Sequence, residues 1–193
     1  EYELKMGSIQ TIMAGTGENI ATVNQYLNEL NAYSDKTIYS FKDMTESIGK
    51  FTNAGVKLED AVAAIKGISN EAAVSGATAS QASHAMYNFA QALSSGYVKL
   101  IDWKSIENAQ MATVEFKQQL IDTAVEVGTL KEVGEGMYET LEGKAMNATK
   151  SFNDTLQDQW MTSDVLIETL KRYADETTEI GAKSSEAATK VKT

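Results

Sequence analysis

The 193-residue chain contains no proline. At the usual content of about 5%, roughly ten prolines would be expected in a chain of this length. Proline interrupts helices and is common in structured loops, so a chain without it is typical of helices joined by Gly, Asn, Ser and Thr. The chain also lacks cysteine, which excludes disulfide bonds and zinc sites built on thiolates. Because of the missing proline, an all-α fold is the first expectation.

The formal net charge is −10, and the charges are distributed unevenly. Residues 1–60 carry a net charge of −4 and residues 102–193 a net charge of −7, whereas residues 61–101 contain only two lysines and one acid. This middle block includes eleven alanines, which indicates either a buried helical hairpin or a helical surface that a partner covers. The acidic balance disfavours sequence-specific binding of nucleic acid, because phosphate neutralisation requires clustered Lys and Arg.

Apolar side chains recur at helical spacing along most of the chain. The clearest stripe runs from Val23 to Tyr33, with spacings of one or three residues that place its members on one helix face. Two alanine-rich helices are expected over residues 58–75 and 78–95, and the short connection between them predicts antiparallel neighbours. Further helices are expected over residues 112–127, 151–159 and 163–177.

Capping residues and glycines indicate where the helices begin and end. Residues 34–40 are expected to form an extended connection, after which Ser40 caps a helix that ends at Gly55. Residues 97–101 are predicted to form a short strand or an extended link, with Asp102 as the cap of the next helix.

The second half of the chain gives weaker signals. Val114 is expected to face inward at the start of the helix at 112–127. Glycines between residues 131 and 144, with partial alternation of apolar residues, indicate a small β-hairpin. The polar segment from Gly181 is expected to fray or to continue as a helix into the rest of a longer protein, from which we interpret this sequence as an excerpt.

The sequence thus predicts an all-α, compact multi-helix bundle with a central Ala-rich antiparallel helical hairpin, and a small β-hairpin near residues 130–145. Three segments are expected. Residues 1–128 form a helical bundle, residues 129–148 a link punctuated by glycines, and residues 149–193 C-terminal helices with a polar tail.

Small residues four positions apart recur in the middle block. This spacing lets helix backbones approach closely, as it does in associating membrane helices, although these helices are too polar to span a membrane. The pattern favours tight helix packing inside the domain, with self-association as the alternative. The pairs are Ala63 and Gly67, Ala72 and Gly76, and Ala92 and Gly96.

Five large side chains on the apolar faces of predicted helices are expected to anchor the core. They are Phe51, Met86, Phe89, Trp103 and Trp160. The two tryptophans could instead stack on a sugar or a base, but Trp on an apolar helix face is more typical of a core.

Few residues could carry chemistry. The lone histidine, His84, lies in a predicted helix and is interpreted as a partly exposed helix residue rather than a general base. The adjacent acids at 59–60 and 175–176 lack the alternating spacing of a calcium loop. The glycines at 15–17 and 134–136 lack the rest of a phosphate-binding motif. No catalytic, cofactor-binding or metal-ligating residue is assigned, and the chain is not expected to be an enzyme.

Several segments in the middle of the chain together carry a family resemblance. They are residues 43–45, 48–56, 64–76, 81–83, 85–87, 91–93 and 96–103. These segments resemble the tail tape measure proteins of long-tailed bacteriophages and prophages, specifically an N-terminal-type conserved region. The similarity extends over about residues 20–130, and residues 151–176 resemble a segment that follows it.

The resemblance implies a structural role in the virion. Tape measure proteins set tail length by stretching through the tube lumen during assembly in the host cytoplasm, and they leave the tail ahead of the genome at infection. The implied partners are further copies of the chain, tail tube, tail-tip or baseplate proteins, and tail assembly chaperones. The alternative is a membrane-active module, in which the Ala- and Gly-rich hairpin refolds into or against the host membrane during ejection. No cofactor is implied.

Overall fold

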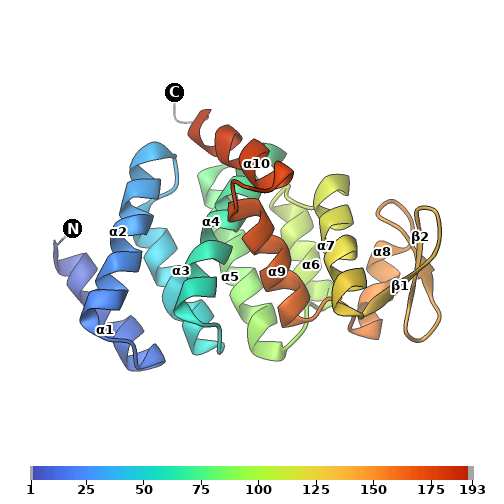
Figure 1. Ribbon diagram of the computed structural model, residues 1–193, viewed down its shortest axis with the longest axis horizontal. Coiled ribbons are helices and arrows are strands. Elements are labelled where there is room, and N and C mark those ends of the chain that lie inside the picture. The colour runs from blue at the N-terminus through green and yellow to red at the C-terminus, as the bar shows by residue number, and fades with distance from the viewer. Residues whose placement is uncertain (1, 191–193) are drawn as a thin grey trace.

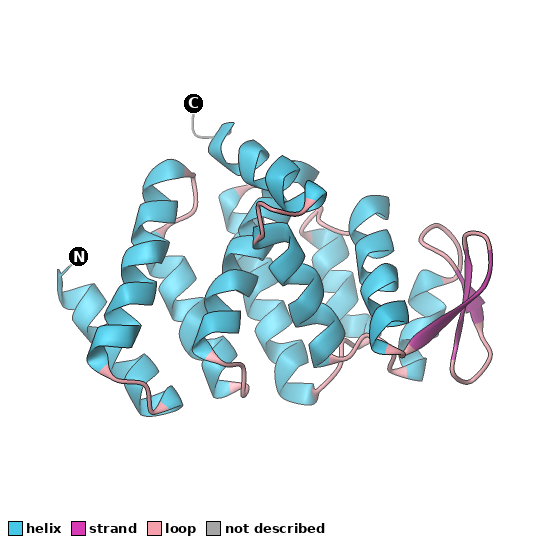
Figure 2. Ribbon diagram, in the orientation of Figure 1, coloured by secondary structure: helices cyan, strands magenta, loops and turns pink. Residues whose placement is uncertain are grey.

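The computed structural model describes residues 2–190 and is mostly helical (Figures 1 and 2). The helices are α1 (Tyr2–Thr16), α2 (Ile20–Lys36), α3 (Phe41–Asn53), α4 (Leu58–Ser75), α5 (Ala79–Ser95), α6 (Leu100–Asn108), α7 (Val114–Val127), α8 (Phe152–Thr155), α9 (Ser163–Ala174) and α10 (Glu179–Lys190). The strands are β1 (Leu130–Gly134), β2 (Met137–Thr140) and β3 (Ala145–Met146). The predicted mostly α bundle with a small β element is confirmed.

The helices form two packed layers (Figure 1). One layer runs α2, α4, α9, α7 along the long axis of the molecule, and the other runs α1, α3, α5, α6. α10 crosses the layer of α4 and α9 at the end where α9 finishes. The small sheet lies at the far end of the molecule from the N-terminus and contacts α7. Apolar faces from both layers meet in one continuous core.

The β element is an antiparallel sheet in the order β1-β2-β3. Leu130 pairs with Thr140 across the first two strands, and Tyr138 pairs with Met146 across the second pair. Gly136, at the tip of the hairpin, has a φ of 70°, which glycine adopts without strain. The hairpin of β1 and β2 was predicted from the glycines between residues 131 and 144. The third strand, β3, spans two residues and is too short to show an alternation of apolar residues in the sequence.

The central alanine-rich helices contact each other, but the most extensive partner of α4 is α9. Most of the circumference of α4 is buried, including residues on the face away from α5. A helix that is buried on most sides must be covered by several neighbours. α9 provides that cover although it comes nearly a hundred residues later in the sequence.

Several predicted helix boundaries are corrected. α2 continues to Lys36, so the connection that was expected from residue 34 is shorter. α6 begins at Leu100, and Asp102 lies inside its first turn, where its carboxylate accepts the Lys99 backbone N–H at 3.1 Å. Asp102 is therefore the third residue of α6, and it caps the helix from there instead of from the position before it. Val114 is 54% exposed because it is the first residue of α7 and faces solvent.

Residues 97–101 are not a separate strand. Tyr97 forms an isolated antiparallel bridge with Thr162, and the backbone N–H of Val98 donates to the Met161 carbonyl at 2.8 Å. This link holds the start of α6 beside the start of α9. The predicted helix at 151–159 is α8 followed by a short 3₁₀ turn, Leu156–Asp158.

The segment from Gly181 is a docked helix, α10, with Ile180, Ser184 and Ala188 buried. Its buried side chains belong to the same core as those of the preceding helices. The three segments predicted from the sequence therefore share one core over residues 2–190. Residue 1 and residues 191–193 of the outer segments lie outside the described residues.

α5 begins with a reciprocal capping interaction that allows a simple test. The Thr78 hydroxyl accepts the Gln81 N–H at 3.0 Å, and the Gln81 side chain accepts the Thr78 N–H at 2.8 Å. We expect Thr78→Ala to lower the free energy of unfolding by about 1 kcal/mol, because one helix N–H then loses its partner. Urea unfolding followed by circular dichroism measures this. Ser80→Ala, at an exposed position of the same turn, is the control and should change stability by less than about 0.5 kcal/mol.

Candidate functional site

Gly67 lies where α4 crosses α9. A Cβ atom on Gly67 would lie 1.9 Å from the carbonyl oxygen of Leu170 and 2.8 Å from its carbonyl carbon. Backbone atoms of a packed helix cannot move aside as a flexible side chain can. Only glycine therefore allows the two helices to approach this closely.

The other five small residues have different surroundings. Ala72 and Ala92 are buried, whereas Gly76 and Gly96 end α4 and α5 in the left-handed conformation. At these two pairs the glycine is thus a helix end and not part of a helix face. Ala63 is partly exposed and lines a groove of about 540 Å³ between α2, α4 and α9.

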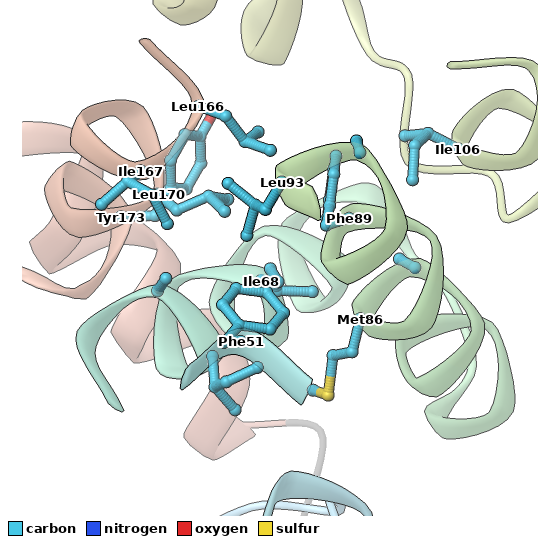
Figure 3. Close-up of a cluster of buried hydrophobic side chains, with 14 of the residues drawn as sticks. Phe51, Ile68, Met86, Phe89, Leu93, Ile106, Leu166, Ile167, Leu170 and Tyr173 are labelled. Atoms are coloured by element: carbon cyan, nitrogen blue, oxygen red, sulfur yellow. The ribbon is translucent and has the colours of Figure 1, made fainter. Parts of the chain in front are cut away.

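The five predicted anchors are all buried. Figure 3 shows Phe51, Met86 and Phe89 in one cluster with side chains from α4 and α9. Trp103 packs against Phe152, with ring centroids 5.1 Å apart. The five anchors are therefore spread along the length of the core.

Trp160 is held by both packing and a hydrogen bond. Its ring meets Phe152 edge-on with a centroid distance of 5.4 Å, and its indole N–H donates to the Thr155 hydroxyl at 2.9 Å. This satisfies the one polar atom of a buried tryptophan.

Sequence reasoning missed the residue that connects these aromatic side chains. Phe116 on α7 is fully buried and contacts Phe89, Trp103 and Tyr173, with centroid distances of 6.4, 6.0 and 5.7 Å. Its spacing of four residues from Leu120 was a helical signal that could have placed it on the inner face.

His84 is exposed on α5, as expected from the sequence. The acidic pairs noted in the sequence make structural contacts. Asp60 on α4 lies 3.0 Å from the Lys171 ammonium on α9, and Asp175 accepts from both the hydroxyl and the N–H of its neighbour Thr177. Over residues 2–190, no three His, Asp or Glu side chains are grouped so that they could hold a metal ion.

Four helices meet at a buried polar junction, which consists of Tyr33, Asn70, Tyr173 and Ser184. The Tyr33 hydroxyl donates to the Asn70 side-chain oxygen at 2.6 Å. The Asn70 amide and the Ser184 hydroxyl both donate to the Tyr173 carbonyl, at 2.8 and 3.0 Å. The junction thus joins α2, α4, α9 and α10, and burial raises the pKa of the Tyr33 and Tyr173 hydroxyls far above the ordinary value.

Beside the junction lies Glu71, the one acid of residues 61–101. Glu71 is 1% exposed, and neither carboxylate oxygen has a hydrogen-bond partner among the described residues. Burial, followed by the charge of Glu115, raises the pKa of Glu71 well above the ordinary value. The sequence signal for this residue was its position between Asn70 and Ala72 in an apolar helix.

These features describe a packed helical module, and a comparison of sequences shows to which protein family it belongs. The sequence model of a family described as tape measure protein matches residues 3–162. The chain belongs to the tape measure protein family. No curated protein and no solved structure matches the chain significantly.

The tape measure family is a structural one, and this chain has a structural role in a phage tail. The matched region ends at residue 162, directly before α9 begins at Ser163. Gly67 thus lies inside the matched region, while the helix that packs on it follows that region. In the described part of this tape measure chain, no helix has both the length and the apolar composition needed to cross a membrane.

In the tape measure chain α4 is buried on most sides and α5 along one face, which supports the interpretation of the middle block as a buried hairpin over that of a bare surface. Exposed apolar side chains remain at its end. Ile101 is 74% exposed, and its neighbour Leu100 is also exposed. Leu100 lines a depression of about 510 Å³ together with Tyr97 and Leu156.

Proposed function

We propose that this chain is a folded assembly module of a tape measure protein, which acts in tail assembly and tail-length determination through contacts with tail proteins or further copies of itself. The observation that carries the proposal is the family match over residues 3–162. The role in assembly, and the location in the tail lumen and, before that, in the host cytoplasm, are parts of this proposal.

The shape of the chain supports a module rather than the spacer that measures length. A single helix rises about 1.5 Å per residue, so 193 residues in one helix would span roughly 290 Å. Here the helices fold back on one another in two layers (Figure 1). Such a bundle converts residue number into length poorly, whereas it offers a broad surface for protein contacts.

We propose that the contact surface includes Leu100 and Ile101. Large apolar side chains exposed next to each other, beside a depression with apolar and polar walls, are typical of protein contact sites. Binding of tail tube, tail-tip and chaperone proteins to the chain can be measured by pull-down and titration, and self-association by sedimentation velocity.

We expect Ile101→Glu to weaken the tightest of these interactions at least tenfold, because a charge would have to be buried at the contact. Ile20→Glu is the matched control, since Ile20 is 53% exposed at the start of α2, and it should leave binding unchanged. A wild-type chain that stays monomeric and binds no tail protein would contradict the assembly role. If Ile101→Glu binds as tightly as Ile20→Glu, the proposed contact surface is wrong, while the assembly role itself is not contradicted.

A further inference from the structure

The Glu71 carboxyl is buried, and none of the residues that the structure describes donates a hydrogen bond to it. The Tyr39 hydroxyl, which also lies close enough for its pKa to be raised by Glu71, is likewise buried without a hydrogen-bond partner among the described residues. Burial of an ionised carboxylate without a hydrogen-bond partner is far more costly than burial of the neutral acid. The folded chain therefore favours the neutral, protonated acid.

The charged and titratable groups around Glu71 come from four elements. Tyr39 belongs to the connection between α2 and α3, Tyr173 to α9 and Glu115 to α7. The Lys183 ammonium of α10 lies 3.1 Å from a Glu115 oxygen and pairs with that acid. The charge of Glu115 acts on Glu71 in the same direction as burial, because a second carboxylate disfavours ionisation of the first.

α10 is linked to Asn70, the residue that precedes Glu71, through a shared hydrogen-bond acceptor. The Tyr173 carbonyl accepts hydrogen bonds from Asn70 on α4 and from Ser184 on α10. α10 lies across α4 and α9 (Figure 1), and a Cβ on its Gly181 would lie 1.8 Å from the Asp175 carbonyl oxygen. Separation of α10 is thus the change that would expose this end of α4 to water while leaving the two layers in contact.

We propose that Glu71 is a proton-dependent latch for α10: the helix docks while the acid is neutral, and loss of the proton releases α10 from α4 and α9. The proton passes to water, and the carboxylate becomes hydrated once α10 has separated. Because the folded chain holds this proton more tightly than the unfolded chain, the contribution to stability is complete below the ordinary pKa of 4.5. It is lost as the pH rises toward the raised pKa of the folded state.

The first test compares wild type, Glu71→Gln and Glu59→Gln by thermal unfolding between pH 5 and pH 8. The Tm of Glu71→Gln should exceed that of wild type by about 5 °C at pH 8, and this difference should shrink toward pH 5. Glu59→Gln makes the same chemical change at an exposed position of α4 and should follow wild type. A constant difference between Glu71→Gln and wild type across this range would overturn the proposal.

The second test follows α10 itself by amide hydrogen exchange, corrected for the intrinsic effect of pH. Protection over Glu179–Lys190 should fall in wild type as the pH rises through the range in which Glu71 loses its proton, and it should stay constant in Glu71→Gln, while protection of α3 changes in neither. A pH-dependent Tm with constant protection of α10 would show a buried acid that is not a latch.

If Glu71→Gln does not fold, the wild-type chain alone decides the question. Infrared spectroscopy of wild type should show a protonated carboxyl C=O band that persists above the pH at which exposed carboxyl groups ionise, with the band decreasing over the same pH range in which α10 loses protection. A band that disappears together with those of exposed carboxyl groups, or that titrates in a different range from α10 exchange, would contradict the latch.

Discussion

Gly67→Ala is expected to lower the free energy of unfolding by about 3–4 kcal/mol, toward the upper end of what single substitutions cause. The added methyl group would lie 1.9 Å from the Leu170 carbonyl oxygen, so α4 and α9 would have to separate or shift along each other. Alanine favours a helix over glycine by about 1 kcal/mol, which offsets part of this cost. Urea unfolding followed by circular dichroism measures the change.

The same substitution at Gly7 is the matched control. Gly7 lies inside α1, and a Cβ placed there has no atom within 4 Å among the described residues. Gly7→Ala should therefore raise stability by about 0.5–1 kcal/mol through helix propensity alone. Gly49→Ala, with its nearest contact at an ordinary 3.8 Å, should be tolerated as well. If Gly67→Ala stabilises the chain as Gly7→Ala does, this result would contradict the close approach of α4 and α9 at Gly67.

The contrast between Gly67 and its partner shows what the sequence could predict. Spacing identified Gly67 as a small residue suited to a close helix approach, and it identified the apolar stripe of the helix that contains Leu170. Hydrophobic periodicity reports which face of a helix is buried, but not which other helix covers it. The two stripes are compatible with several pairings, so the neighbour in sequence, α5, was expected where α9 provides most of the contact.

Helix ends were predicted less well than helices, for local reasons. At the start of α6, Asp102 can serve as a cap or as the third residue of the first turn, and both assignments satisfy one free N–H group. The structure selects the second, because Val98 must donate to the Met161 carbonyl, which fixes the chain just before Lys99. A contact distant in sequence thus determines a boundary that a local pattern leaves open.

The polar junction could not be assembled from the sequence. Tyr33, Asn70 and Ser184 lie on three separate helices, and each is an ordinary residue in its own segment. Glu71 was nonetheless visible as the lone acid of residues 61–101. Which face of α4 this acid occupies decides its energetic cost, because an ionised carboxylate is costly when it is buried and costs little when it is exposed.

Phe116→Ala is expected to lower the free energy of unfolding by about 4 kcal/mol. The ring is fully buried and touches Phe89 on α5, Trp103 on α6 and Tyr173 on α9, so its removal leaves a cavity where both layers meet. Each aromatic contact adds about 0.5–1.5 kcal/mol beyond the area that it buries. Urea unfolding measures the loss, and tryptophan fluorescence should change as well, because the Trp103 ring stacks on Phe116 at 6.0 Å.

Phe116→Leu separates the loss of volume from the loss of the aromatic contacts. Leucine refills most of the cavity, so this variant should cost less than half as much as alanine while still altering the fluorescence of Trp103. Trp160 contacts Phe152 and not Phe116, so its signal should stay constant in both variants. Equal losses for leucine and alanine would mean that the ring contacts, and not the filling of space between the layers, determine the stability at this position. A loss below about 1 kcal/mol for alanine would contradict the central place of Phe116 in the core.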